Sequence, residues 1–178
     1  VVPEVEYAYI LLNKPKDYIT TLDDPQGRKT VMELIKGATT QRMFPVGRLD
    51  RNTTGVLLLT NDGSFSQQVC HPTFEISKVY EVKLDKFFVS GDRTRLLYGL
   101  MLEDGPVSFD EVVVIGEKSL RVTLHEGRNR IVRRTFAYLG YTVVDLCRIA
   151  IGSIKLDRLL PGQSMPLTAA EIDSILKN

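Results

Sequence analysis

The chain has 178 residues, of which 43% are hydrophobic and 25% are charged, and its formal net charge is +1. This composition is typical of a globular protein with a sizeable core, and the charge argues against a wholly basic surface. The longest apolar run is too short to span a bilayer, and the two cysteines and two histidines lack metal-ligand spacing, so we expect a cytoplasmic protein with reduced cysteines and no metal site.

The predicted elements are mainly strands, with helices between them and no strict strand–helix–strand alternation. This pattern predicts an α+β fold with a mixed, largely antiparallel sheet and flanking helices. Two helix starts have the spacing of a capping box, Thr30 with Glu33 and Thr168 with Glu171. In chain order we expect a strand over 7–12, a helix over 30–35, strands over 43–46 and 56–60, a helix over 64–70, a strand over 79–84, a helix over 92–101, a hairpin of 111–115 and 120–124, a helix over 129–139, a strand over 142–151 and a helix over 168–176.

One loop combines a carboxylate with two arginines directly before an apolar run. Asp50 lies between Arg48 and Arg51, and the run over 56–59 follows. On charge pattern alone, Asp50 is a turn residue that bonds its own backbone while both arginines are solvated. The alternative is that flanking strands hold the carboxylate rigidly, ready to attack or stabilise an electron-poor sugar carbon.

A second basic segment runs from His125 to Arg134 and contains four arginines and one glutamate. Such a local patch on a near-neutral protein suits a polyanion that is gripped at one place. Read alone, the same segment is a solvated or phosphate-binding helix face. Tyr80 lies in a strand of alternating pattern, and read from that pattern alone it is a core tyrosine whose hydroxyl is hydrogen-bonded.

Several of these segments together resemble the motifs of bacterial ribosomal RNA pseudouridine synthases. The likeness is closest to the branch that modifies single uridines, and within it to the large-subunit (23S) pseudouridine synthase B group. The matching segments are Leu12-Asn13-Lys14-Pro15-Lys16, Gly47-Arg48-Leu49-Asp50 with Thr53 and Gly55, the run over 57–63, Lys78-Val79-Tyr80-Glu81-Val82, the segment 126–134, and Pro161-Gly162.

The resemblance implies a fold of two lobes around a central cleft, formed by residues 1–178 as one catalytic domain. It also implies isomerisation of uridine to pseudouridine, in which the N1–C1′ bond breaks, the base turns and C5 bonds to C1′. This reaction needs neither a cofactor nor a metal. By the family's motifs, Asp50 acts at C1′ or at the 2′ proton, Tyr80 helps to remove the C5 proton and packs on the base, and Arg133 holds the aspartate.

The family's substrate implies further contacts with RNA. Arg48 is expected to stack in the gap left by the everted base. The partner is ribosomal RNA, 23S rather than 16S, either free or in an assembling particle, and the enzyme is expected to be a monomer. The remaining predicted RNA contacts are Lys14 and Arg51, together with Arg128, Arg130 and Arg134, which are expected to bind phosphates that position rather than specify.

The chain departs from the family's pattern at a few positions. Asp17 stands where glycine is frequent, Ile131 where glutamine is common and Thr135 where methionine is common. Many relatives begin with a small alpha-L-type RNA-binding domain, and none precedes Val1. We expect this domain to be absent or truncated, in which case the chain keeps its chemistry and loses RNA affinity.

Two other functions compete with this reading. A non-catalytic RNA-binding module would keep the basic patch but leave Asp50 idle, with salt-dependent affinity and no isomerisation. A nuclease or glycosidase would need a second positioned carboxylate or a metal pair. Asp62 and Asp85 are available for that role, but neither has a spacing that supports it.

Overall fold

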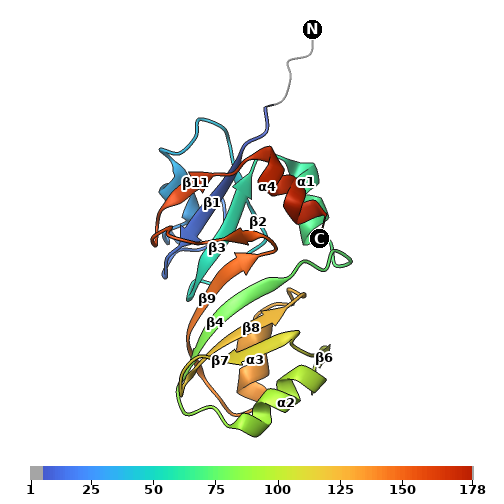
Figure 1. Ribbon diagram of the computed structural model, residues 1–178. Coiled ribbons are helices and arrows are strands. Elements are labelled where there is room, and N and C mark those ends of the chain that lie inside the picture. The colour runs from blue at the N-terminus through green and yellow to red at the C-terminus, as the bar shows by residue number, and fades with distance from the viewer. Residues whose placement is uncertain (1–5, 178) are drawn as a thin grey trace.

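The computed structural model describes residues 6–177 and is built around one sheet of nine strands (Figure 1). The strands of this sheet are β1 (Tyr9–Lys14), β2 (Phe44–Val46), β3 (Thr53–Thr60), β4 (Lys78–Leu84), β7 (Glu111–Val114), β8 (Ser119–Leu124), β9 (Val143–Ile151), β10 (Ile154–Lys155) and β11 (Ser164–Pro166). A separate small sheet pairs β5 (Leu100–Leu102) with β6 (Gly105–Val107). The helices are α1 (Gly63–Cys70), α2 (Ser90–Tyr98), α3 (Ile131–Tyr138) and α4 (Ala169–Leu176), with a short 3₁₀ helix η1 (Val31–Ile35).

The strand order of the large sheet is β11–β1–β3–β9–β4–β8–β7, with β2 paired to β3 and β10 paired to β9. Among these pairings only β3–β9 is parallel. The prediction of an α+β fold with a mixed, largely antiparallel sheet is therefore confirmed.

The sheet is continuous, but its two ends carry different helices and form two lobes (Figure 1). In the first lobe, β1 and β3 are buried on both faces. Leu57 and Leu59 belong to one apolar cluster, while Val56 and Leu58 belong to another that includes residues of α1 and α4. Burial on both faces explains why β3 is an uninterrupted apolar run rather than an alternating one.

The second lobe contains β4, β7 and β8 with α2 and α3 (Figure 1). Here the strands alternate: Leu120, Val122 and Leu124 are fully buried, whereas Arg121 between them is exposed. The buried side chains of β4 and β8 pack with Phe136 and its helical neighbours on α3. This packing fixes α3, and with it the arginines that precede and occupy its first turns, against one face of the sheet.

Strand β9 joins the lobes, because it pairs with β3 of the first lobe and with β4 of the second. The β3–β9 approach is close at Gly55, whose φ is 111°. A Cβ atom at Gly55 would lie 2.1 Å from the carbonyl oxygen of Arg148. Only glycine permits two backbones to pass at this distance.

Most predicted elements are confirmed to within a few residues, including the hairpin and the capping box of Thr168 with Glu171. The predicted cap at Thr30 is wrong, since its side chain makes no capping bond and the segment is 3₁₀ rather than α. The helix expected over 92–101 ends at Tyr98, because Gly99 has a φ of 115° and the chain then enters β5. The three-residue strands β5, β6 and β11 are too short to have been predicted from periodicity.

Within residues 6–177, no helix combines the length and the apolar character that crossing a membrane requires. The expectation about an RNA-binding domain ahead of Val1 concerns sequence outside the described residues.

Candidate active site

Asp50 lies in the turn that leads into β3, with its side chain 29% exposed. The N–H of Thr53 donates to the Asp50 carbonyl oxygen (3.0 Å) and closes the turn. Leu49 is buried, and both its N–H and its carbonyl bond to the hydroxyl of Thr20 (3.2 and 2.8 Å). An anchored neighbour on one side and a closed turn on the other hold the carboxylate at the surface in a defined position.

Two arginines at the start of α3 hold this turn from the second lobe. Arg130 donates from its guanidinium to Oδ2 of Asp50 (3.0 Å), and its backbone has a left-handed φ of 54°. Arg133 instead donates to the carbonyl of Asn52 (3.1 Å) and the hydroxyl of Thr53 (3.2 Å). From the sequence we expected Arg133 to hold the Asp50 carboxylate and Arg130 to bind a phosphate of the RNA. In the structure Arg130 makes the direct ion pair, and Arg133 binds the backbone that follows Asp50.

The difference follows from where each side chain starts. Arg130 is the N-cap residue of α3 and has an exposed side chain, whereas Arg133 lies within the helix and is half-buried. Burial lowers the pKa of Arg133, the charge of Arg130 lowers it further, and the charge of Asp50 opposes both. The Nε atom of Arg133 is buried without a hydrogen-bond partner among the described residues, so one donor of this guanidinium is left unused beside the turn.

Lys14 is fully buried, which corrects its predicted role as an RNA contact. Its ammonium group donates to the carbonyls of Thr53 (2.8 Å) and Pro15 (2.9 Å), and lies 3.4 Å from that of Arg51. Burial lowers its pKa to about 8, against the opposing charges of Asp50 and Asp17. A buried lysine cannot reach a phosphate; this one ties the end of β1 to the turn that carries Asp50.

Asp17 strengthens the same connection. Its N–H donates to the carbonyl of Arg51 (2.9 Å), and its φ of 72° is in the left-handed region that favours glycine. This conformation fits the glycine that the family resemblance leads us to expect at this position. The Asp17 carboxylate also lies 3.6 Å from the guanidinium of Arg51, an exposed contact that leaves Arg51 accessible.

Tyr80 lies in a row of directly paired residues that runs across five strands of the sheet and includes Lys14 and Arg148. Lys14 pairs with Gly55, Gly55 with Arg148, Arg148 with Tyr80, and Tyr80 with Val122. Directly paired residues lie on the same face, and adjacent strands are about 4.8 Å apart, so Tyr80 is about 10 Å from Gly55.

The ring of Tyr80 is 8% exposed and belongs to the core cluster under α3. Its hydroxyl has no hydrogen-bond partner in the described part of the chain. The hydroxyl oxygen is also not fully buried. The ring is therefore packed while the hydroxyl keeps contact with solvent, as a group that exchanges protons with a substrate requires.

The other predicted RNA contacts differ in how accessible they are. Arg48 is exposed and makes no ion pair among the described residues. Arg134 forms a two-pronged ion pair with Asp104 (2.9 and 3.0 Å). Arg128 bonds to Asp104 (3.1 Å) and Glu126 (2.6 Å). A phosphate must compete with carboxylates at Arg128 and Arg134, but not at Arg48.

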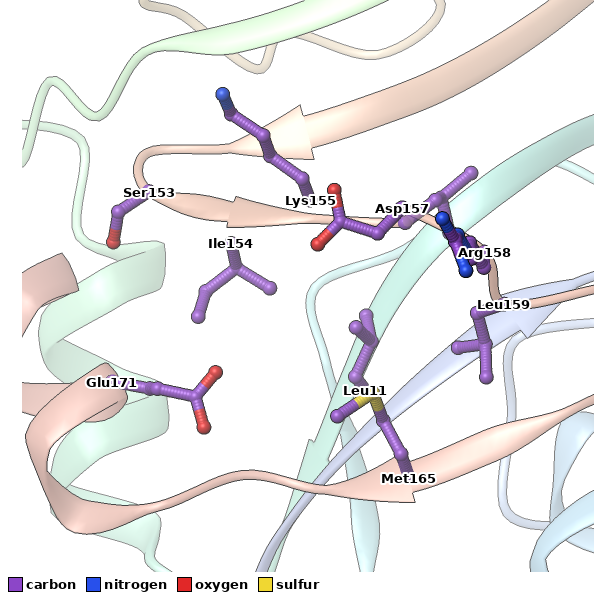
Figure 2. A pocket seen from close by; sticks show the side chains of 10 residues that line it. Leu11, Ser153, Ile154, Lys155, Asp157, Arg158, Leu159, Met165 and Glu171 are labelled. Carbon is purple, nitrogen blue, oxygen red and sulfur yellow. The ribbon is translucent and has the colours of Figure 1, made fainter.

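A cavity of about 820 Å³ lies elsewhere, in the first lobe between β10, β11 and α4 (Figure 2). Apolar side chains such as Leu11, Ile154 and Met165 line it together with Lys155 and Glu171. None of the predicted site residues takes part, and the Glu171 carboxylate is already used in the cap of α4. The candidate site is therefore the Asp50 turn and not this cavity.

The prediction from sequence missed Arg148. It is a charged residue in the predicted strand 142–151, yet it is only 6% exposed. A single arginine within the segment Leu146–Ile151, between otherwise apolar or small residues, was the available signal.

Comparisons with known proteins identify the family of the chain. The sequence profile of the family described as RNA pseudouridylate synthase matches residues 8–138. An uncharacterized RNA pseudouridine synthase of Aquifex aeolicus (strain VF5) is 42% identical over 174 residues, covering 95% of this chain and 70% of that protein. The ribosomal large subunit pseudouridine synthase B of Bacillus subtilis (strain 168) is 36% identical over 173 residues, covering 94% of this chain and 70% of that protein.

Solved structures give the same result for the fold. A crystal structure of a pseudouridylate synthase superimposes with a TM-score of 0.87 at 31% identity, covering 96% of this chain and 74% of that one. The human RNA pseudouridylate synthase domain containing 1 matches with a TM-score of 0.54 at 14% identity, which is a likeness of fold alone.

Proposed function

Because the chain belongs to the RNA pseudouridylate synthase family, we propose that it isomerises a uridine of ribosomal RNA to pseudouridine with Asp50 at the sugar. The observation that carries this assignment is the position of Asp50. Its carboxylate is partly exposed, sits on a closed turn and is paired with Arg130 from the other lobe. A carboxylate held in this position can add to C1′ or remove the 2′ proton.

The reaction balances without any added group. The N1–C1′ bond breaks, the uracil turns, C5 bonds to C1′, C5 gives up its proton and N1 gains one. Tyr80 is proposed to pack on the base through its ring and to help move the C5 proton through its hydroxyl. The solvent contact of that hydroxyl and its lack of a protein partner support this role.

The arginines of α3 are proposed to act in different ways. Arg130 pairs with the carboxylate, while Arg133 and Lys14 position the turn by bonding its backbone from two sides. Arg48 is free to stack in place of the everted base or to meet a phosphate. Because similar proteins include large subunit pseudouridine synthases B, we propose 23S rather than 16S rRNA as the substrate.

Tritium release from in vitro transcripts of 23S and 16S rRNA made with 5-tritiated uridine tests this proposal. Wild-type protein is expected to release tritium from the 23S transcript, and Asp50→Asn to release none while unfolding at the same temperature. Asp157→Asn is the matched control, because Asp157 is exposed in the first lobe and asparagine tolerates its left-handed φ of 49°.

Two results would contradict the proposal. Tritium release by folded Asp50→Asn would remove Asp50 from the chemistry. RNA binding by the wild type without release from either transcript would favour a non-catalytic RNA-binding module.

A further inference from the structure

Two cations, Lys78 and Arg148, lie beside Tyr80 without carboxylate partners. Lys78 is the first residue of β4, and Arg148 is the direct neighbour of Tyr80 on β9. Among the described residues, the side chain of Lys78 makes no hydrogen bond and no ion pair. Arg148 donates only from Nε, to the carbonyl of Val56 (3.0 Å). These two side chains are thus left with several unused N–H donors.

The unused donors of Arg148 are not sealed inside the protein. Arg148 is 6% exposed as a whole residue. In the described part of the chain, the only side-chain polar atom that is both fully buried and without a hydrogen-bond partner is Nε of Arg133, so the terminal nitrogens of Arg148 are not fully buried. The terminal nitrogens of Arg148 therefore keep some contact with solvent. An arginine that served only to fill the core would be expected to have these donors satisfied by carbonyls.

The two charges also oppose each other. Burial lowers the pKa of Lys78, and the charge of Arg148 lowers it further, while Glu126 acts in the other direction without forming an ion pair. Two like charges held together without a counter-ion are unfavourable, and an anion between them relieves the repulsion.

The loop at Gly127 approaches the ammonium group of Lys78 closely. A Cβ atom on Gly127 would lie 2.9 Å from Nζ of Lys78, so a larger residue here would displace the ammonium group. Gly127 lies in the arginine segment, three residues before Arg130, whose side chain pairs with Asp50. The pair of cations is therefore bordered by the loop that reaches the catalytic turn.

We propose that Lys78 and Arg148 form a subsite for one phosphodiester group of the RNA strand, next to the everted uridine that packs on Tyr80. This proposal rests on the proposed function, since it takes the RNA strand as the ligand. A phosphate is the anion favoured here because it accepts from a lysine and an arginine at once. Neither residue was among the RNA contacts predicted from the sequence.

The test measures the salt dependence of binding to a fluorescein-labelled oligouridylate by fluorescence anisotropy. A protein that neutralises one phosphate fewer on a single strand shows a slope of log K against log [salt] that is shallower by about 0.7. Lys78→Met is expected to show that change, and Lys78→Arg to keep the wild-type slope. Lys78→Gln is measured as well, so that a folded variant lacking the charge is available if methionine prevents folding.

Lys83→Met is the matched control, because Lys83 is exposed on the same strand, on the opposite face. It removes the same charge and is expected to leave the slope close to wild type. Equal slopes for wild type and folded Lys78→Met or Lys78→Gln would overturn the proposal, as would an equal change in Lys83→Met.

This result is independent of catalysis. A shallower slope for Lys78→Met supports the subsite even if no tritium is released by the wild type. Tritium release with an unchanged slope supports the proposed function and rejects the subsite.

Discussion

The Gly55→Ala substitution is expected to destabilise the fold by several kcal/mol. The new Cβ atom would lie 2.1 Å from the carbonyl oxygen and 2.7 Å from the nitrogen of Arg148. Both atoms belong to the backbone of β9, so no side-chain rotation can relieve the overlap. The φ of 111° at Gly55 is also unfavourable for alanine.

The size of the effect follows from these distances. Ordinary contact begins at 3.4 Å, so β3 and β9 must separate by about 3.4 − 2.1 = 1.3 Å. A hydrogen bond of about 2.9 Å would then be broken. Losing about two or three bonds at ~1 kcal/mol each, with about 1–3 kcal/mol of backbone strain, gives a loss of about 3–6 kcal/mol. That is a large fraction of the ~5–15 kcal/mol by which domains are stable.

Urea unfolding followed by far-ultraviolet circular dichroism measures this loss. Gly63→Ala is the control, since a Cβ atom there meets nothing within 4 Å and Gly63 begins α1. We expect Gly63→Ala to be neutral or slightly stabilising. A Gly55→Ala protein within about 1 kcal/mol of wild type would refute the argument that this close approach requires glycine.

Two further predictions concern the turn that carries Asp50. Lys14 has a pKa lowered to about 8 from 10.5. Between these values the unfolded chain keeps a proton that the folded protein has lost, so the contribution of Lys14 to the free energy of unfolding rises with pH. Urea titrations across this window should show that rise in wild type and lose it in Lys14→Met; an identical pH dependence would contradict the buried amine. Arg130→Gln removes the ion pair with Asp50 and should lower the single-turnover rate of tritium release about 100-fold, whereas a rate within twofold of wild type would show that this ion pair is not needed.

The sequence predicted the elements whose burial repeats over several residues. The run from Val56 to Leu59 is buried on both faces, and β8 alternates because one face meets α3 and the other meets solvent. Such patterns are set by the environment of the whole strand, so they survive errors of a residue or two at the ends. The helix cap at Thr168 was also readable, because a capping box depends only on residues three apart.

The roles of individual cations could not be predicted in the same way. Lys14 and Arg130 were both expected to contact RNA, yet Lys14 is buried under the Asp50 turn and Arg130 pairs with the Asp50 carboxylate. The reach of a long side chain depends on where its backbone is placed in three dimensions, which spacing along the chain does not contain. A lysine directly after the apolar run from Ile10 to Leu12 was a signal of burial, but the same lysine fits an exposed strand end equally well.

The geometry of the site depends on a strand that contributes none of the family's motifs. The profile match ends at residue 138, before β9 begins at Val143. The strands that follow Asp50 and contain Tyr80 do not pair with each other; β9 lies between them and pairs with both. Two strand spacings, about 10 Å, therefore separate Tyr80 from Gly55, which lies on β3 five residues after Asp50. Gly55 allows the first spacing to close, and Arg148, from the middle of β9, brings a guanidinium to the point where the three strands meet. Under the proposed function, the motifs supply the reacting groups, and β9 sets the spacing of the two strands next to them.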